Sequence, residues 1–194
     1  MMEVPHVVKD LASLRDICGD PHPHTPYKVQ EELTEQAKTF LGKSPFLLLT
    51  TVSEDGTPTV SPKGGQAGFV RLKDNILYLP DIKGNNLIFS LQNILQHPKV
   101  GLIFLLPGTG ETLRIHGTAQ ISSDPELCSS YPINGKPARL VTVIEISAYY
   151  FHCSMSLNIA KLWKPEAWSD KMKISWREEI DPNLPAGSGP SKYS

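Results

Sequence analysis

The chain has 194 residues, of which 40% are hydrophobic, and a formal net charge of −1 from 19 Lys and Arg against 20 Asp and Glu. This length and apolar content suit one ordinary folded domain with flexible ends. The near-zero charge disfavours nucleic acid and anionic membranes as partners, and no apolar stretch approaches the roughly 20 residues that span a bilayer.

The N-terminal segment predicts two helices around a loop. Apolar residues recur weakly at helical spacing over 7–17 and clearly over 27–43, where Gly42 stands near the expected helix end. The prolines of 19–26 predict a loop between them. His22 and His24 in this loop have no acidic or cysteine companions in a motif, so we interpret them as solvated rather than metal-binding. The first residues have neither a basic start nor an apolar block, and we therefore expect a soluble, cytoplasmic protein.

Short strands and turns dominate the middle of the chain. We expect strands over 45–52, 57–61, 68–72, 76–80, 100–106, 112–122 and 141–150. Asp55-Gly56 predicts a hairpin turn, and a helix is expected over 86–96, where His97-Pro98 ends it. The mixed pattern of 151–163 allows a short helix. Six or seven antiparallel strands with few helices predict a mainly β protein with a barrel architecture.

Three segments follow from this pattern. The N-terminal helix and the Pro/His-rich loop occupy 1–26, and the barrel domain occupies 27–168. From 169 to 194 the chain loses regular periodicity, and its Pro, Gly and Ser content predicts a flexible tail.

Two Lys-Gly pairs, Lys63-Gly64 and Lys83-Gly84, stand at turns and strand ends. Lysine places a cation and glycine lets an anion approach the backbone, so two such pairs in one β domain suggest a bound phosphate. The N–H groups and the positive dipole end of the expected helix over 86–96 could face the same phosphate. Taken alone, a lysine in a turn is more often a solvated surface charge.

Other familiar sites are disfavoured. Three cysteines without CxxC spacing imply neither a disulfide framework nor a zinc site. His152 and Cys153 are neighbours in an expected strand and point to opposite faces, which argues against a nucleophile pair. No hydrolase, nucleotide-binding, zinc-protease or calcium motif is present.

Several short motifs follow one another in a distinctive order: Ser44-Pro-Phe-Leu47, Asp55-Gly-Thr-Pro58, Val60-Ser-Pro-Lys-Gly64, Leu79-Pro-Asp81, Gly84-Asn-Asn86, His97-Pro-Lys-Val-Gly101 and Pro107-Gly-Thr-Gly-Glu-Thr-Leu-Arg114. Their order and spacing resemble the pyridoxamine-phosphate-oxidase-related family of FMN-binding split barrels. Within it, the chain resembles the FMN-dependent oxidase-type flavoproteins of bacteria. The match covers roughly 14–168.

The resemblance implies a split β-barrel homodimer with two FMN molecules at the subunit interface, each touched by both chains. It also implies that the following residues bind the cofactor: Ser61, Pro62, Lys63, Gly64, Asp81, Lys83, Gly84, Asn85, Asn86, Glu111, Thr112, Arg114 and Trp163. From the residues alone, Arg114 suits a ligand contact or a cross-strand ion pair about equally.

Our functional prediction is an FMN-dependent oxidoreductase. It would transfer electrons or hydride between a reduced nicotinamide, NADH or NADPH, or a small organic substrate and an acceptor. The flavin would supply the chemistry, so no catalytic residue is assigned. Residues 163–194 lack the Arg-rich substrate-binding C-terminus of pyridoxamine phosphate oxidase, which makes that activity less expected.

A second hypothesis is a non-catalytic split-barrel module for flavin, haem or a lost ligand. It is favoured where basic residues of relatives are replaced, by Ile82, Leu87, Met155 and Ile159. A third hypothesis, a deazaflavin-dependent reductase, would need a basic groove that the neutral composition does not suggest.

Overall fold

The computed structural model describes residues 4–82, 84, 86–153 and 155–174. Contacts divide the chain into two compact units, Met1–Met155 and Ser156–Ser194. The first unit contains the β-sheet, and the second contains a short helical segment. Within the described residues, no helix is both long and apolar enough to cross a membrane.

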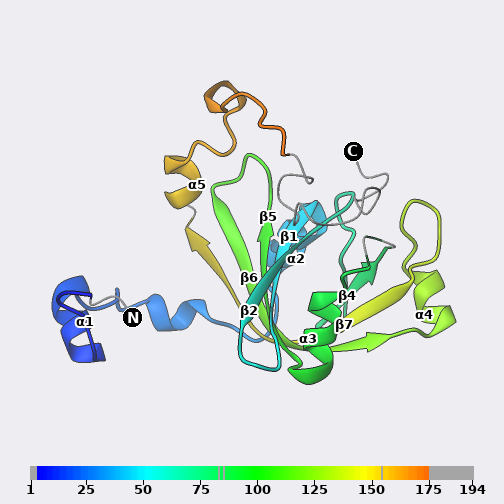
Figure 1. Cartoon of the computed structure of the whole chain (residues 1–194), viewed down its shortest axis with the longest axis horizontal. Coiled ribbons are helices and arrows are strands. Elements are labelled where there is room, and N and C mark those ends of the chain that lie inside the picture. Colours follow the sequence, from blue (N-terminus) through cyan, green and yellow to red (C-terminus); the bar gives the residue numbers. More distant parts are fainter. Residues whose placement is uncertain (1–3, 83, 85, 154, 175–194) are drawn as a thin grey trace, which may run out of the picture. The chain divides into compact units, whose positions relative to one another are not determined.

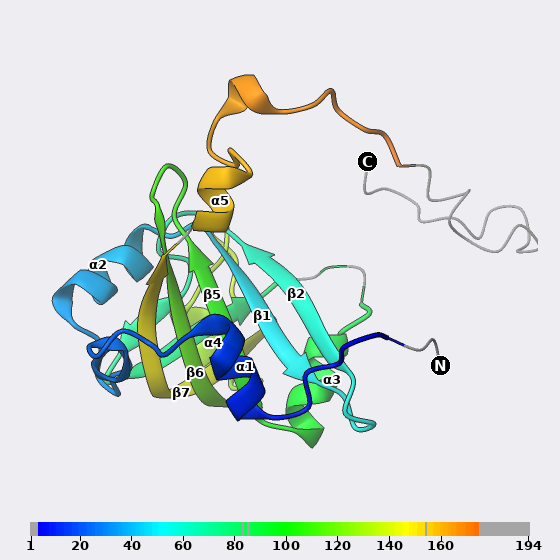
Figure 2. The ribbon, with the colours of Figure 1, turned by 90° about the vertical axis from the view of Figure 1, so that its left-hand side faces the viewer.

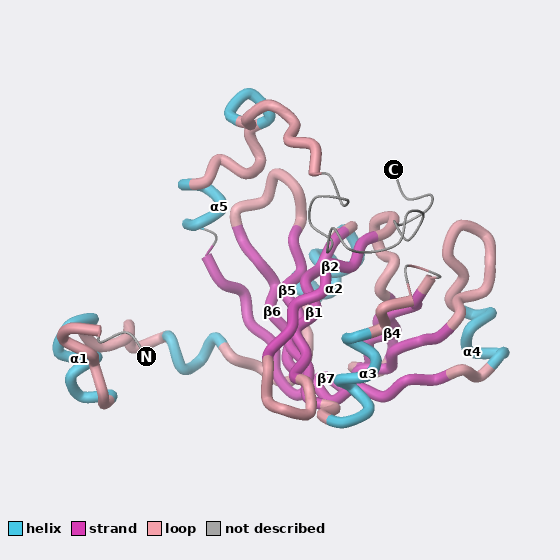
Figure 3. Tube along the Cα trace, viewed as in Figure 1, coloured by secondary structure: helices cyan, strands magenta, loops and turns pink. Residues whose placement is uncertain are grey.

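Seven strands form one antiparallel sheet in the first unit, which confirms the predicted mainly β split-barrel fold (Figures 1 and 3). The strand order is β2-β1-β5-β6-β7-β4-β3, so β2 and β3 each pair on one side only. The bounds are β1 (Phe46–Val52), β2 (Pro58–Gly64), β3 (Arg71–Lys73), β4 (Ile76–Asp81), β5 (Lys99–Leu105), β6 (Glu111–Ser122) and β7 (Leu140–Cys153).

The core lies on one face of this curved sheet because side chains alternate along each strand. In β1 the buried residues are Leu47, Leu49 and Thr51, and the residues between them are partly exposed. The register of β1 with β5 places Leu102 opposite Leu49 and Phe104 opposite Leu47, both fully buried. Figure 2 shows β2, β1, β5 and β6 side by side in this order.

A β-bulge at His116 and Gly117 shifts the register of β6 against β7. A Cβ atom on Gly117 would lie 2.5 Å from the backbone oxygen of Glu145, so only glycine fits there. The bulge lets the two longest strands stay paired while they bend.

The helices are short. They are α1 (Leu11–Cys18), α2 (Glu35–Lys43), α3 (Phe89–Gln96), α4 (Pro125–Ser130) and, at the junction with the second unit, α5 (Met155–Ile159), with single 3₁₀ turns at Thr25–Lys28 and Pro165–Ala167. The α4 helix was not predicted from the sequence, where Asp124 and Pro125 form a helix start: the Asp124 carboxylate accepts from the Leu127 N–H at 2.7 Å.

Two predicted helices begin later than expected. The helix predicted over 27–43 begins at Glu35, because Thr34 caps it and Gln30 instead pairs with Tyr149 of β7. The helix predicted over 86–96 begins at Phe89, because Asn86 and Ile88 adopt left-handed backbone angles (φ 61° and 47°) that no right-handed helix contains.

Two predicted strands also have different bounds. The strand predicted over 57–61 continues to Gly64, and the strand predicted over 68–72 is Arg71–Lys73. The turn that follows consists of Asp74 and Asn75, both left-handed, as a two-residue hairpin turn requires. Lys73 therefore lies in the strand and not in the turn.

Candidate functional site

One face of β2 carries the first polar residues of the site. Thr59, Ser61 and Lys63 alternate with exposed residues and lie opposite the buried Thr51, Leu49 and Leu47 of β1. Their side chains therefore point toward the interior of the barrel. Since β2 is an edge strand, it pairs laterally only with β1.

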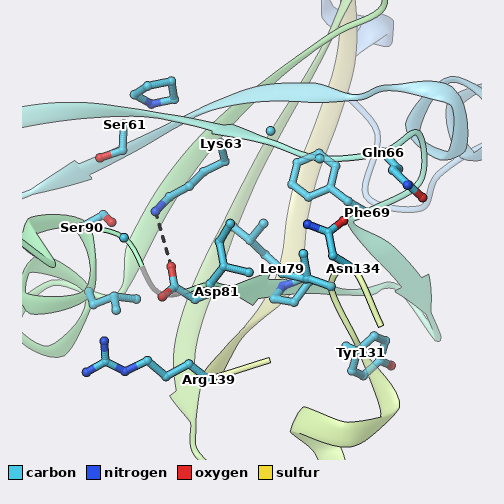
Figure 4. Close-up of a pocket in the computed structure, with 18 of the residues that line it drawn as sticks. Ser61, Lys63, Gln66, Phe69, Leu79, Asp81, Ser90, Tyr131, Asn134 and Arg139 are labelled. Atoms are coloured by element: carbon cyan, nitrogen blue, oxygen red, sulfur yellow. Dashed lines mark ion pairs between the residues drawn. The ribbon is translucent and has the colours of Figure 1, made fainter. Parts of the chain in front are cut away.

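Asp81 at the end of β4 faces Lys63. The Lys63 Nζ atom lies 3.9 Å from the Asp81 Oδ1 atom, and the two side chains are 25% and 23% exposed (Figure 4). Burial raises the pKa of Asp81, while the charges of Lys63 and Arg139 act in the opposite direction. The two cations therefore do not fully offset the effect of burial on the pKa of this carboxyl group.

Arg139 is the second cation at this place. Its backbone N–H donates to the Asp81 carbonyl at 3.0 Å, because it directly precedes β7, which pairs with β4. Its guanidinium Nη1 donates to the Asn86 side-chain oxygen at 2.9 Å. The pairing of β4 with β7 therefore places the Arg139 side chain close to Asp81 and Asn86.

The segment before α3 forms the third wall. Ile88 is the N-cap residue and makes no side-chain cap hydrogen bond. A left-handed conformation is unfavourable for a β-branched residue such as Ile88, and such strain concentrates at functional sites. Ser90, in the first turn of α3, is 4% exposed and lines the pocket.

These walls enclose a pocket of about 640 Å³, within the range of small-molecule sites. We name its two regions by the residues labelled in Figure 4. The polar end consists of Ser61, Lys63, Asp81, Ser90 and Arg139, and the ring end consists of Gln66, Phe69, Leu79, Tyr131 and Asn134.

Two close packing contacts shape the ring end. The ring of Tyr131 stacks on Tyr78 of β4 with centroids 4.7 Å apart and planes 9° apart. A Cβ atom on Gly65 would lie 2.8 Å from Phe69, so this glycine lets the turn close against the aromatic ring. The ring end therefore offers fixed apolar surface together with two amide side chains.

Most of the predicted site residues of the first unit lie together in this pocket. Its lining includes Ser61, Pro62, Lys63, Gly64, Asp81, Gly84 and Asn86. The predicted residues Lys83 and Asn85 lie outside the described residues. The lining does not include Glu111, Thr112 or Arg114 of β6. Trp163 belongs to the second unit, and its predicted role stays a prediction.

Arg114 lies on the outer face of the sheet, between the buried Leu113 and Ile115. Its cross-strand neighbours are Ile103 and Tyr150, and its guanidinium carbon lies 5.9 Å from the Tyr150 ring centroid. Its Nε atom is buried without a hydrogen-bond partner among the described residues. A carboxylate is not opposite Arg114 in the register, so the cross-strand ion pair considered from the sequence is not formed there.

The sequence reasoning missed Arg139 and the whole ring end. Arg139 carried one usable signal, its place directly before the last predicted strand, but the sequence alone did not show that this strand pairs with β4. Tyr131 and Asn134 lie between α4 and β7, a connection that gave no motif. Gln66 falls between two predicted strands, and Phe69 falls within the strand predicted over 68–72, whereas the structure places both residues in the connection between β2 and β3.

Metal binding has no support in the described part of the chain. No group of three or more His, Cys, Asp or Glu residues there could hold a metal ion. The rings of His22 and His24 lie 5.1 Å apart and both residues are exposed. The three cysteines are free, and Cys128 alone among them is buried.

Comparison with known proteins gives a family and a fold. Residues 33–153 match the family model described as pyridoxamine 5'-phosphate oxidase. A comparison with curated protein sequences gives no match.

Three solved structures illustrate the structural likeness. HupZ of Group A Streptococcus is 18% identical, with a TM-score of 0.50, over 63% of this chain and 96% of its own. A single-residue variant of HupZ is 17% identical, also with a TM-score of 0.50, over 62% of this chain and all of its own. A putative pyridoxamine 5'-phosphate oxidase of Lactobacillus delbrueckii is 24% identical, with a TM-score of 0.47, over 62% of this chain and 95% of its own.

At these identities the HupZ structures support the fold alone. The family-model match covers well over half of the chain and includes every strand of the sheet. The chain belongs to the pyridoxamine 5'-phosphate oxidase family of split barrels.

Proposed function

We propose that the chain binds FMN in the pocket described above and acts as an FMN-dependent oxidoreductase. The observation that carries the proposal is the polar end, where Lys63 of β2 and Arg139, directly before β7, both act on Asp81 of β4. Membership of a flavin-binding family supports the same proposal.

The polar end fits the phosphate of FMN. A phosphomonoester carries roughly −1.5 to −2 charges and accepts several hydrogen bonds. Lys63 and Arg139 offer cations, and Ser61 and Ser90 offer hydroxyl donors in the same pocket. Guanidinium groups are suited to phosphate because their N–H groups match its oxygens in pairs.

The ring end fits the isoalloxazine ring system of FMN. Phe69, Leu79 and Tyr131 present apolar surface, and the Gln66 and Asn134 amides offer donors and acceptors for ring edges. The flavin, when bound, supplies the redox chemistry, and the protein binds, orients and shields it. We propose that a reduced nicotinamide, NADH or NADPH, or a small organic substrate is the donor.

We further propose a cytoplasmic homodimer in which a second chain completes each site. Arg114 supports this arrangement, because it is a partly exposed cation on the outer face of the sheet, where its guanidinium lies over the Tyr150 ring. A guanidinium has five N–H donors, and its terminal Nη groups would donate to an acceptor on a second chain or its cofactor. Glu111 and Thr112 lie on the same strand and would approach the same interface.

The visible spectrum of the purified protein tests the function. We expect the absorbance bands of oxidised flavin after addition of FMN and removal of excess ligand, and bleaching of these bands by NADH or NADPH under anaerobic conditions. A protein that retains no FMN would contradict the proposal. A Soret band with haem, in place of flavin bands, would assign the pocket to haem.

A non-catalytic binding module is the second candidate. Ile82 and Leu87 favour it, because both line the pocket, are 53% exposed, and replace basic residues expected from the family resemblance. Retention of FMN without reduction by either nicotinamide nucleotide or by small organic donors would support this candidate over the oxidoreductase.

A further inference from the structure

A buried polar cluster links α3 to the first two strands. The Asn93 side-chain amide donates to the Thr51 hydroxyl at 3.0 Å and to the Thr59 hydroxyl at 2.9 Å. The two hydroxyl oxygens lie 2.8 Å apart and hydrogen-bond to each other. Asn93 is 7% exposed and Thr51 is 1% exposed. Since an amide NH₂ has two hydrogens, both donors of Asn93 are used.

The cluster stands directly behind the pocket without lining it. Thr59 points to the same face of β2 as Ser61 and Lys63, which do line the pocket. Asn93 lies three residues after Ser90, so it is one helical turn from the pocket wall on the same side of α3. One amide therefore connects the strand that carries Lys63 to the helix that carries Ser90.

This connection matters because neither wall is fixed to the other by pairing within the sheet. The β2 strand is at the edge of the sheet and pairs only with β1. The α3 helix begins without a side-chain cap and is entered through the left-handed Ile88. Packing against β1 does not fix how far the start of α3 slides along the sheet, whereas two directional hydrogen bonds at one amide do.

We propose that Asn93 is a positioning residue, which through Thr51 and Thr59 fixes the start of α3 relative to β2 so that Ser90 and Lys63 meet one anionic group. The ligand part of this inference rests on the proposed binding of FMN. A misplacement of about 1 Å in such a site lowers performance by as much as 100-fold in enzymes. Asn93 does not contact the ligand and acts only by holding β2 and α3 in place.

The test is the variant Asn93→Leu, which keeps the approximate volume of the side chain and removes both donors. We expect the Kd for FMN to rise about tenfold, which corresponds to the loss of one well-placed charged contact. We also expect amide hydrogen exchange to become faster selectively over 88–96 and 58–64. The matched control is Ser44→Ala, since Ser44 is also buried, donates to the Phe40 carbonyl at 2.9 Å, and does not line the pocket.

The threonines provide a second set of variants. Thr59→Ser keeps the hydroxyl and should behave like the wild type, whereas Thr59→Val should weaken FMN binding. Combining Thr59→Val with Asn93→Leu should add little to Asn93→Leu alone, because both remove the same link.

The outcomes separate the two proposals. Unchanged exchange over 88–96 and 58–64 in Asn93→Leu would overturn the positioning role, and so would an equal loss of FMN affinity in Ser44→Ala. If the wild type does not bind FMN, the proposed function fails, and hydrogen exchange in the absence of ligand still decides whether Asn93 fixes the two walls.

Discussion

The cations at the polar end of the pocket and the cation Arg114 on the outer face of the sheet differ in their polar partners. At the polar end, Lys63 faces Asp81 at 3.9 Å and Arg139 donates to Asn86 at 2.9 Å, so each cation has a polar partner. On the outer face, Arg114 lies over the Tyr150 ring, and its buried Nε has no hydrogen-bond partner among the described residues. Both places belong to the same sheet.

The difference indicates that one chain supplies polar partners for the cations of the polar end but not for the Nε atom of Arg114. The polar end has internal partners that an incoming anion can replace, because a phosphate offers more acceptors than Asp81 and Asn86 supply. The outer face has a donor whose acceptor is not supplied by the described chain. We therefore expect loss of the pocket cations to act on ligand binding directly, and loss of Arg114 to act through a second chain.

The largest effect should come from removing both pocket cations. In the variant Lys63→Ala with Arg139→Ala, we expect the Kd for FMN to rise at least about 100-fold, since each charged hydrogen bond contributes about 1.5–3 kcal/mol. Fluorescence titration of FMN measures the Kd. Lys99→Ala is a suitable control, because Lys99 lies on β5 and its amine donates to Thr118. An unchanged Kd in the double variant would show that the polar end does not bind the cofactor.

Removal of Arg114 should have a smaller effect that depends on protein concentration. We expect Arg114→Ala to raise the Kd for FMN about tenfold, equivalent to one charged contact, and to weaken self-association. Sedimentation at several protein concentrations, with and without FMN, measures both. Weakened FMN binding in a protein that stays monomeric throughout would contradict the role of a second chain.

The sequence predicted the barrel better than the pocket, and the reason is physical. Strands such as β1 carry their own signal, because Phe46–Val52 is a short run of apolar and β-branched residues followed by a turn. Lys63 was found because a motif of the family surrounds it. Arg139 reaches the pocket only through the pairing of β7 with β4, which connects residues more than 50 positions apart. No local pattern records such a pairing.

The start of α3 is a second feature that the sequence pattern does not predict. Helical spacing of apolar residues continues back to Leu87, yet Asn86 and Ile88 are left-handed and the helix begins at Phe89. Spacing reports which side chains share a face but does not report backbone strain. Strained residues that the surrounding structure holds in place are therefore missed by pattern reasoning.

Gly84 lines the pocket, and its replacement by alanine tests whether the anion approaches the backbone there. A Cβ atom on Gly84 would meet no atom within 4 Å among the described residues, so Gly84→Ala should leave the melting temperature nearly unchanged. If an anion approaches this backbone closely, the added methyl should raise the Kd for FMN about threefold. Gly42→Ala in α2 is the control, since its Cβ also has free space and it lies outside the pocket lining. Equal Kd values in the two variants would argue against close approach at Gly84.

The smallest effect concerns the pH dependence of stability. Burial raises the pKa of Asp81 above its ordinary value of 3.8, so the folded protein binds this proton more readily than the unfolded chain. The folded state is therefore relatively favoured at low pH, and this contribution is lost as pH rises through the raised pKa. We expect Asp81→Asn to raise the melting temperature relative to wild type at pH 7, by an amount that shrinks as pH falls toward 4.

Paired thermal melts at these pH values measure the difference. A difference that grows as the pH falls would contradict the expected sign and would mean that Lys63 and Arg139 outweigh the burial of the carboxylate.

The central claim, that the polar end holds the phosphate of a flavin nucleotide, is tested most directly by comparing FMN with riboflavin, which has the same ring and no phosphate. We predict that wild-type protein binds FMN at least about 100-fold more tightly than riboflavin, and that the ratio falls close to one in Lys63→Ala with Arg139→Ala. Equal affinities in the wild type, or a ratio that the double variant leaves unchanged, would contradict the claim.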